Sequence, residues 1–356
     1  METTKDLSGI TMCLLDWYSE NKRDLPWRDT NDPYPVWLSE VILQQTRIAQ
    51  GKDYYLRFID RFPNVQSLAA AEEEEVLKLW QGLGYYTRAR NLHAAAKQIM
   101  TRFNGRFPAG YSDILSLKGI GKYTAAAISS IAFHAPYAVV DGNVFRVVAR
   151  LFAVEAPIDT AEGKKEISEI AQSLLHTDQP GTYNQAIMDF GSLVCTPVQP
   201  KCDDCPLQVY CRAYEWKKVS AFPVTGRKPV VRRRYFNYLH IIQGSKTFIQ
   251  KRNGADIWKN LYEFPLIETS EAVDFLILSQ TDDFRHLFPE NINLSVDHRL
   301  TLRHQLTHQA IHTQFYRLEI SDEISFNPPP GLIRIDEKDL AAYPVSRLTD
   351  RYIEII

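Results

Sequence analysis

Long apolar runs are missing from this sequence, whose hydrophobic stretches fall far short of the ~20 residues that a membrane-spanning helix needs. Its first residues, Met1 to Asp6, contain neither the apolar core of a secretion signal nor an arginine-rich targeting pattern. Low-complexity tracts and internal repeats are absent as well. These absences predict a globular protein that does not enter a membrane and stays in the compartment where it is made.

Net charge is nearly absent too, because 41 basic and 43 acidic residues give a formal charge of −2. This small net charge does not indicate a nucleic-acid partner, although a local basic face would be enough to bind one. The hydrophobic content of 45% is typical of a soluble globular chain. Since 356 residues exceed the size of one ordinary compact core, two domains are expected.

Cysteine is scarce, with five residues in all, and one of them, Cys13, is expected to be a small core residue. The other four follow the spacing C-x6-C-x2-C-x5-C, as Cys195, Cys202, Cys205 and Cys211. The loops between them are too short for two unstrained disulfides, whereas four converging thiolates suit a tetrahedral metal or an iron–sulfur cluster. Structural zinc sites usually present two closely spaced cysteine pairs, and only one is present here. The spacing therefore favours a cluster over zinc.

Residues 8–216 have the periodicity of successive α-helices and few strand signals. One helix is predicted to begin at Pro35, since proline is tolerated in a first turn, and to extend through Thr46. Further helices are predicted near residues 53–61, 73–80, 86–103, 122–133, 143–152, 162–176 and 183–193. This region should be an all-α unit that ends with the cysteine loop.

The composition changes at residues 217–234, where seven basic residues and no acidic one accompany two prolines and a glycine. This segment is expected to be an inter-domain linker, either a solvated connector or one that binds a phosphate backbone. Beyond it the period becomes two, which is typical of strands. Strands are predicted at 235–242, 247–252, 261–266 and 314–320, and helices at 275–278 and 338–342. Residues 235–356 should therefore form an α+β domain.

Three features of the helical region are candidates for chemistry, and each has a simpler structural interpretation. Glu40 shares a helix face with Leu43, although an exposed helix glutamate is ordinary. Gly119 and Gly121 precede an alanine-rich helix, either as a plain helix–helix turn or as a hairpin whose amides hold a DNA phosphate. Asp141 lies just before another helix. It is either an N-cap that stabilises this helix by ~1 kcal/mol or a carboxylate at the mouth of a pocket.

In this order and spacing, the glycine hairpin, the Asp141-Gly-Asn143 segment and the cysteine loop resemble the helix-hairpin-helix DNA glycosylases of endonuclease III type. Within that superfamily, four N-terminal motifs resemble the adenine DNA glycosylases. These motifs are Leu25-Pro-Trp27-Arg28 and residues 36–46, 80–92 and 184–191. Residues 235–356 resemble, with weaker motifs, the Nudix-like 8-oxoguanine-recognition domain of that family.

The resemblance covers nearly the whole chain and implies its organisation. Residues 1–216 would form a mainly α helix-hairpin-helix glycosylase domain that carries a [4Fe-4S] cluster in the loop 195–211. Residues 217–234 would be the basic linker, and residues 235–356 the α+β Nudix-like domain.

The resemblance also implies which side chains carry the chemistry. Glu40 would protonate adenine N7 as the glycosidic bond breaks, and Asp141 would stabilise the positively charged sugar or bond briefly to C1′. Asn143 and Tyr123 would hydrogen-bond around these carboxylates. The adenine pocket would be lined by Trp27, Arg28, Leu43 and Gln185. Contacts with DNA and the lesion would come from Gln44, Tyr85, Gly119, Gly121, Arg146, Thr307 and His308.

Position 123 separates two activities within the superfamily. The lyase members have a catalytic lysine two residues after the second hairpin glycine, where this chain has Tyr123, and Lys122 points about 100° away on the helix. Without that amine no Schiff base to the sugar is expected, so we predict a monofunctional adenine glycosylase. The alternatives are an endonuclease III-like bifunctional pyrimidine glycosylase and AP lyase, or a DNA-binding scaffold with a decayed site.

The expected substrate is double-stranded DNA containing adenine opposite 8-oxoguanine or guanine, bound by a monomer in the cytoplasm of a bacterium, at its nucleoid. The second domain lacks the Arg-Glu-x2-Glu-Glu run of a Nudix hydrolase, so nucleotide hydrolysis is not expected. The segment 302–308 matches the family's damage-sensing Phe-Ser-His loop only in part, since Leu306 replaces the aromatic residue and Thr307 keeps a hydroxyl. The histidines at 304, 308 and 312 would suit a metal only on a helix, and the local pattern favours a hairpin.

Overall fold

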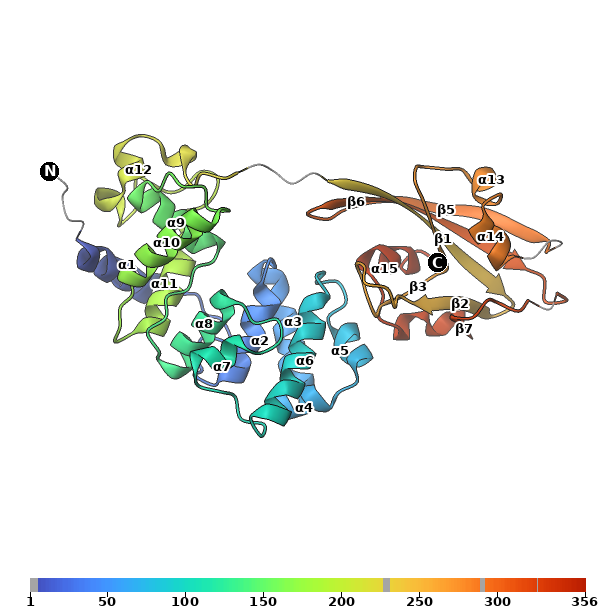
Figure 1. Ribbon diagram of the computed structural model, residues 1–356, viewed down its shortest axis with the longest axis horizontal. Helices are drawn as coiled ribbons and strands as arrows, with labels where there is room; N and C mark the ends of the chain where they lie inside the picture. Colours follow the sequence, from blue (N-terminus) through green and yellow to red (C-terminus); the bar gives the residue numbers. More distant parts are fainter. Residues whose placement is uncertain (1–5, 227–230, 289–291, 325) are drawn as a thin grey trace. The chain divides into compact units, whose positions relative to one another are not determined.

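The computed structural model describes residues 6–226, 231–288, 292–324 and 326–356. Positions 227–230 of the predicted linker lie outside the described residues. Figure 1 traces the chain from a helical N-terminal region to a sheet formed by the C-terminal region. Among the described residues, no helix is both long and apolar enough to cross a bilayer.

The contacts of the chain form two compact units. One takes its residues from Met1–Ala70 and Asn91–Arg227, and the other from Ala71–Arg90 and Lys228–Ile356. The predicted domains divide the sequence once, around the linker, whereas the second unit also includes a segment from within the helical region. The two units are described separately below.

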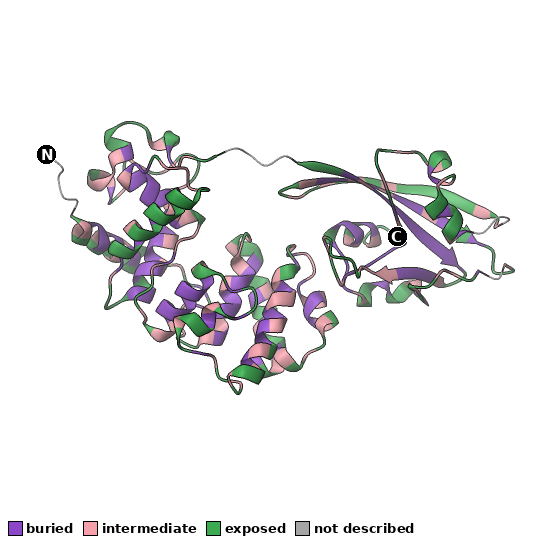
Figure 2. Cartoon of the chain, viewed as in Figure 1, coloured by how far each residue is buried: buried purple, intermediate pink, exposed green. Residues whose placement is uncertain are grey.

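The first unit is α-helical, as predicted. Its α-helices are α1 (Leu7–Asn21), α2 (Pro33–Leu43), α3 (Ile48–Arg61), α4 (Val65–Ala70), α7 (Tyr111–Leu115), α8 (Lys122–Phe133), α9 (Gly142–Phe152), α10 (Ala161–Ser173), α11 (Pro180–Leu193) and α12 (Arg212–Glu215), with most of α6 (Thr87–Arg102). The sequence did not predict α4 and α7, because one or two turns are too short to show a hydrophobic period. In Figure 2 the buried residues gather where these helices meet.

Helix α2 carries the predicted acid and begins two residues earlier than expected. Asp32 caps its N-terminus by accepting a hydrogen bond from the Tyr34 amide at 2.9 Å, and Pro33 occupies the first turn. The fully buried Trp37 lies on this helix, which packs against α8. Helix α11 in turn packs against α1, α8 and α9. This packing arranges α2, α8, α9 and α11 around one space.

The second unit is an α+β fold, as predicted, built on a seven-stranded sheet. The strands are β1 (Arg232–Gln243), β2 (Lys246–Lys251), β3 (Tyr262–Glu263), β4 (Leu266–Thr269), β5 (Leu294–Gln305), β6 (Gln309–Ile320) and β7 (Leu332–Asp336). Its helices are α5 (Glu73–Leu79), α13 (Phe275–Leu278), α14 (Asp282–Leu287), the 3-10 helix η3 (Glu337–Ala342) and α15 (Arg347–Ile353).

The sheet has the order β3-β2-β1-β6-β5, with β4 paired to β1 and β7 paired to β2. Strands β1 and β6 are parallel, and β5 and β6 form an antiparallel hairpin whose turn contains residues 306–308. The hairpin predicted around the three histidines is therefore confirmed. The single strand predicted at 261–266 is wrong, because the chain forms β3 and β4 on either side of Pro265, which has no amide to donate to a ladder.

Hydrophobic cores cover both faces of the sheet. On one face Phe315 packs under α15, where the Tyr352 ring stacks on it with centroids 4.4 Å apart. On the other face Leu318 belongs to a core completed by α13 and α14, which includes Phe284. Residues 71–90 join this unit through side-chain hydrogen bonds, such as the one that the Gln81 amide donates to Asp350 at 2.7 Å.

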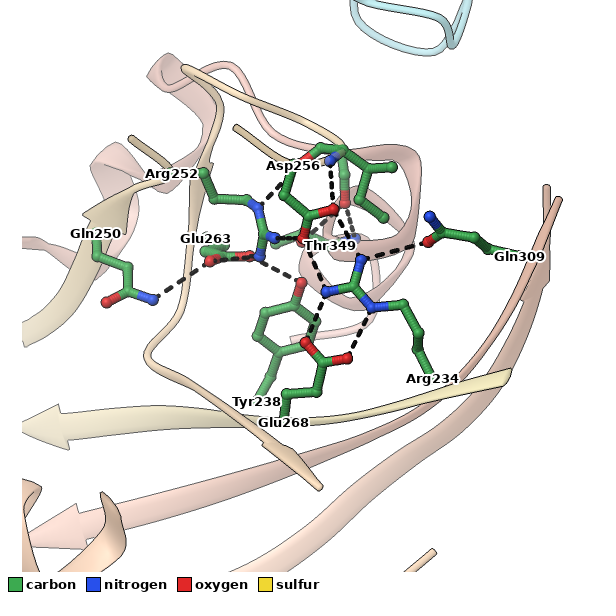
Figure 3. A network of polar contacts seen from close by, with 11 residues as sticks. Arg234, Tyr238, Gln250, Arg252, Asp256, Glu263, Glu268, Gln309 and Thr349 are labelled. Atoms are coloured by element: carbon green, nitrogen blue, oxygen red, sulfur yellow. Dashed lines mark hydrogen bonds and ion pairs between the residues drawn. The ribbon is translucent and has the colours of Figure 1, made fainter. Parts of the chain in front are cut away.

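A network of two arginines and three carboxylates lies beside the sheet (Figure 3). Arg234 pairs with Asp256 at 2.7 Å and with Glu268 at 2.6 Å. Arg252 donates to both oxygens of the buried Glu263, at 2.9 and 2.8 Å. Each carboxylate is thus neutralised by a guanidinium. Within the described part of the chain, no three metal-ligating side chains converge on a position for a metal ion.

Candidate active site

A cavity of about 810 Å³ opens between α2, α8, α9 and α11 in the first unit. Its lining includes all the predicted catalytic and adenine-pocket residues, together with Gln44, which was predicted to contact DNA; the former are Trp27, Arg28, Glu40, Leu43, Tyr123, Asp141, Asn143 and Gln185. The fold therefore brings together side chains that are distant in sequence. Gly119, Gly121 and Arg146 lie in the same unit outside this lining, and Tyr85, Thr307 and His308 belong to the second unit.

Glu40 is partly buried near the end of α2 and lines the cavity. Its carboxylate accepts a hydrogen bond from the Tyr123 hydroxyl at 2.5 Å. Burial raises the pKa of Glu40, and the charge of Asp141 adds to this effect, while the Tyr123 hydrogen bond and the charge of Arg28 oppose it. A carboxyl that keeps its proton to a higher pH than usual is suited to act as a general acid.

Asp141 caps the N-terminus of α9 and also lines the cavity, so both interpretations of this residue hold together. Its Oδ1 accepts the backbone amides of Asn143 at 2.9 Å and Val144 at 2.8 Å, and its Oδ2 accepts the Asn143 side-chain amide at 2.8 Å. Burial raises the pKa of Asp141, and these three hydrogen bonds oppose that rise. Donors that surround a carboxylate in this way favour its ionised form.

Arg146 holds Asn143 in the orientation that serves Asp141. The Arg146 guanidinium, which is buried, donates to the side-chain oxygen of Asn143 at 2.9 Å, so the amide nitrogen faces Asp141. It also donates to the carbonyls of Gly191 at 2.6 Å and Cys195 at 2.7 Å. Arg146 was predicted to contact DNA, but its donors are directed inward to protein acceptors. This geometry corresponds to a positioning residue.

Arg28 and Gln185 also line the cavity, and a buried carboxylate holds Arg28. Asp189 is fully buried and pairs with Arg28 at 2.8 Å, and it also accepts a hydrogen bond from Arg23. The Tyr18 hydroxyl donates to the Gln185 side-chain oxygen at 2.8 Å, which leaves the Gln185 amide nitrogen free of that contact. The predicted pocket residues thus have fixed orientations.

Trp27 and Leu43 supply apolar walls. Trp27 is buried and packs edge-on against Tyr55, with ring centroids 5.0 Å apart. A side chain at Gly51 would place its Cβ 2.6 Å from a Leu43 methyl group, so glycine at this position makes room for Leu43. Apolar walls of this kind weaken the solvation of a carboxylate, and desolvation is the largest cause of the raised pKa of Glu40.

The glycine hairpin joins α7 to α8 in the predicted place. Gly119 has a φ of +77°, and a Cβ there would lie 2.5 Å from the Asn91 side chain, so this position requires glycine. Gly121 is exposed in extended backbone at the N-cap of α8. Gly121 and Lys122 are both exposed at this helix N-terminus, the kind of position at which proteins bind anions. Gln44, at the C-cap of α2, donates to the Thr124 hydroxyl on α8 at 3.1 Å.

The four cysteines of the predicted cluster line one further cavity, of about 30 Å³, with apolar neighbours; they are Cys195, Cys202, Cys205 and Cys211. This volume is roughly two to three times the ~10–15 Å³ that one water needs. Burial raises the pKa of Cys205 to about 12, and the other three cysteines add to the rise. Four ionised thiols would therefore need a positively charged group between them.

Four cysteine sulfurs around one cavity are a donor set that fits an iron–sulfur cluster, and the same set fits a zinc ion. Among the described residues, no three potential ligands converge on one point. Arg150, buried on α9, fixes the loop by donating to the Thr196 carbonyl at 2.7 Å and lies 3.4 Å from the Cys195 sulfur.

Tyr85 and Thr307 meet in the second unit. The Tyr85 hydroxyl and the Thr307 hydroxyl are 2.9 Å apart, and both residues are exposed. Tyr85 has a φ of +46°, a backbone conformation that an L-residue adopts only when its surroundings hold it there. His308, also exposed, follows in the same hairpin turn. Two predicted lesion contacts that are distant in sequence are therefore neighbours.

Sequence reasoning missed several residues that support the site. Asp189 follows Gln185 by one helical turn, so its place on the pocket face could have been read from the spacing. Tyr18, Arg23 and Arg150 carried no such signal, because their partners lie far away in the sequence. Only the folded chain shows these pairings.

Two family models match this chain. Residues 38–176 match the HhH-GPD superfamily base excision DNA repair proteins, and residues 237–354 match the NUDIX domain. The chain is also 36% identical over 261 residues to the adenine DNA glycosylase of Buchnera aphidicola subsp. Schizaphis graminum (strain Sg). That match covers 73% of this chain and 75% of the relative.

Among solved structures, the chain resembles a thermostable thymine-DNA glycosylase, with 30% identity and a TM-score of 0.55 over 59% of this chain and 97% of that one. It also resembles endonuclease III in a non-covalent complex with DNA, with 22% identity and a TM-score of 0.51 over 59% and 97% of the two chains. The second likeness concerns the fold alone. Both agree with the helical architecture of the first unit.

Proposed function

We propose that this chain, which belongs to the adenine DNA glycosylases of the HhH-GPD superfamily, hydrolyses the N-glycosidic bond of adenine mispaired with 8-oxoguanine in double-stranded DNA. The observation that carries this proposal is the meeting of Glu40 and Asp141 in one cavity. Two carboxylates with different surroundings are what glycoside hydrolysis uses, one as acid and one as anion.

Glu40 is the proposed acid. Adenine is a poor leaving group as an anion, and a proton at N7 turns it into a neutral one. Glu40 donates that proton while the C1′–N9 bond breaks and its electron pair leaves with the base. Burial raises the pKa of Glu40, which keeps the proton available, and Tyr123 orients the carboxyl group.

Asp141 is the proposed stabiliser of the sugar. Loss of adenine leaves positive charge on C1′ and the ring oxygen, and an anionic carboxylate lowers the energy of that state. Asn143 and the cap amides fix Asp141 in place and favour its ionised form, against the burial that raises its pKa. Water then adds to C1′ and returns a proton to Glu40, which completes the hydrolysis.

The enzyme is proposed to be monofunctional. Lys122 is exposed at the start of α8 and does not line the cavity, whereas Tyr123 does. No amine is therefore supplied at the position where the lyases form a Schiff base. Borohydride trapping on adenine-containing mispairs should give no strong covalent complex. A strong one formed through Lys122 would replace this proposal with the bifunctional alternative.

A [4Fe-4S] cluster is proposed for Cys195, Cys202, Cys205 and Cys211. When bound, it would link the four thiolates and fix the loop, and it would supply no step of the hydrolysis. Arg146 and Arg150 join this loop to α9, the helix that Asp141 caps. The exposed residue Lys201 lies on this loop and is proposed to contact DNA. Removing the iron should therefore weaken DNA binding more than it unfolds the remaining helices.

Recognition of the base opposite adenine is assigned to Tyr85, Thr307 and His308. A flipped adenine leaves a gap that a wedge must fill, and an exposed aromatic ring is suited to that position. The Thr307 hydroxyl and the His308 ring can hydrogen-bond the N7–H or O8 edge that distinguishes 8-oxoguanine from guanine. The contact between Tyr85 and Thr307 supports joint action.

The function is tested by single-turnover release of adenine from duplexes in which adenine faces 8-oxoguanine, guanine or thymine. We expect fast release opposite 8-oxoguanine, slower release opposite guanine and none opposite thymine. Equal rates for all three would disprove the proposed recognition. Release of pyrimidines in place of adenine would disprove the proposed activity.

A further inference from the structure

One part of the sheet in the second unit is open to solvent and carries basic and aromatic side chains. Three of these side chains form a row across adjacent strands: Tyr235 on β1 pairs with His312 on β6, and His312 pairs with Arg303 on β5. Residues paired directly across strands point to the same face, and so does Arg233, two residues before Tyr235. We call Arg233, Tyr235, Arg303 and His312 the arginine–ring patch.

The patch lies on this sheet face next to the part that α13, α14 and the segment before α13 cover. Helices α13 and α14 cover the far half of the face, over Leu318. The Gln314 amide, in the next row, donates to the Val273 carbonyl at 2.7 Å, so the segment before α13 reaches that row. Arg233 and Arg303 are exposed, and Figure 2 shows exposed residues along β5 and at the start of β1.

The two arginines of the patch are not neutralised. Within the described residues, neither Arg233 nor Arg303 has a side-chain hydrogen bond or an ion pair. Other arginines of the same hairpin do have carboxylate partners, such as Arg299 with Asp297 at 2.9 Å. Guanidinium groups without a carboxylate partner can bind an anion.

The rings of the patch are arranged for contact through their polar edges. Tyr235 and His312 stack with centroids 5.2 Å apart and planes inclined by 22°. Because each ring covers a face of the other, no base can insert between them. Their hydroxyl and ring N–H groups remain as donors next to the arginines, which favours phosphate oxygens over unstacked bases.

The patch also has a fixed distance along the hairpin from the turn at residues 306–308, which contains the proposed lesion contacts Thr307 and His308. Arg303 precedes Thr307 by four residues along the hairpin, a length of about 13 Å at ~3.3 Å per residue. Successive base pairs of duplex DNA rise by ~3.4 Å, so this length corresponds to about four base pairs. A duplex whose lesion lies at Thr307 would pass the patch within this distance.

From these observations we infer that the arginine–ring patch binds the phosphate backbone of duplex DNA about four base pairs from the 8-oxoguanine. This inference rests on the proposed function, because it takes the lesion-containing duplex as the ligand. The patch would extend the DNA contact beyond the turn at 306–308. It would add affinity that does not depend on sequence and is lost as salt increases.

The test measures the affinity of the full chain for a long duplex with adenine opposite 8-oxoguanine between 50 and 200 mM salt. Each lost phosphate contact lowers the slope of log affinity against log salt by about 0.9. As salt rises over this range, the affinity of wild type should therefore fall by a factor about ten times larger than that of the double variant Arg233→Ala, Arg303→Ala. The double variant to lysine should keep the wild-type slope. Arg299→Ala, a matched arginine on β5, should keep it as well.

Duplex length supplies a second readout. Two further duplexes are each shortened on one side, so that one end lies within three base pairs of the lesion, and the two are shortened on different sides. One of these truncations should abolish the difference in salt slope between wild type and the double alanine variant, and the other should preserve that difference. A difference that survives both truncations would overturn the inference, because the patch would then not act on flanking phosphates.

Other outcomes are equally decisive. Equal salt slopes for wild type and the double alanine variant would disprove the patch as a DNA contact and leave it for a protein partner. A loss seen only with single-stranded DNA would assign it to that ligand instead. Adenine release by wild type is measured in parallel: if it fails, the proposed function fails, and if it succeeds while the slopes are equal, only the patch is refuted.

Discussion

Glu40 in the first unit is partly buried and Glu263 in the second is buried, and the two carboxylates have opposite surroundings. Burial raises the pKa of both residues, so burial does not distinguish them. Glu263 receives two bonds from Arg252, one from Tyr238 and one from Gln250, which occupy both of its oxygens. Glu40 receives its bond from Tyr123 and faces a cavity.

This difference shows how one chain uses buried acids in two ways. The network around Glu263 is closed, since guanidinium groups neutralise its carboxylates and leave no place for a metal among the described residues (Figure 3). This closed network lies in the region that matches the NUDIX domain. Glu40 is left with bonding capacity toward a reactant, which a catalytic acid requires.

The largest expected effect is that of Asp141→Asn. Asparagine is as good an N-cap as aspartate, so α9 should keep its stability while the cavity loses its anion. We expect the single-turnover rate of adenine release to fall by about 10²–10³-fold, with the midpoint of unfolding nearly unchanged. A rate close to that of wild type would show that the sugar needs no anion here.

Glu263→Gln should affect stability and leave the chemistry intact. The substitution removes from Arg252, whose side chain is 12% exposed, its nearest carboxylate, and breaking a buried ion pair typically costs about 3–5 kcal/mol. Denaturant unfolding should show this loss in the second unit. The rate of adenine release per folded molecule should match wild type, and a lower rate would mean that the network also serves the active site.

Tyr123→Phe should move the pH dependence of the reaction. Glu40 acts in its protonated form, so the rate falls as pH rises through its pKa, which burial has raised. The Tyr123 hydrogen bond favours the ionised form, and its loss should raise that pKa further. The alkaline fall in rate should therefore move to higher pH. A move to lower pH would contradict the proposed role of Tyr123.

The smallest effect is expected for Tyr85→Phe. This change removes the hydrogen bond to Thr307 and keeps the ring, at a cost of about 0.5–1.5 kcal/mol. The preference for adenine opposite 8-oxoguanine over adenine opposite guanine should fall by about 2–10-fold. Thr307→Val is the matched change on the other partner. If the two single variants and the double variant do not show coupling, the residues act independently.

Much of the fold and the site was predictable from sequence. The helices of the first unit have clear apolar periods, and the motifs around Glu40, Asp141 and the cysteines predicted side chains that the fold then brought into two cavities. Strand β5 was not among the predicted strands, although Leu294, Val296, Leu300 and Leu302 alternate with polar residues along it, because most of its residues are exposed. The short helix α15 was missed for lack of length.

The supporting contacts were beyond sequence reasoning for a physical reason. Asp189 pairs with Arg23 and Arg28 across more than 150 positions, and such pairings depend on helix packing that no local pattern records. Arg146 shows the same limit, because a basic residue near a DNA-binding motif is expected at the surface. Its burial beside Asn143 became visible only in the folded chain.

The contrast between the two glutamates is tested most directly by the pH dependence of the single-turnover rate in wild type and Glu40→Gln. Because the pKa of Glu40 is raised in the folded chain, ionising it opposes folding, so the glutamine variant should be at least as stable at neutral pH. We predict a large loss of rate in this variant and no alkaline limb. A variant as fast as wild type, or one that keeps the same limb, would contradict Glu40 as the acid.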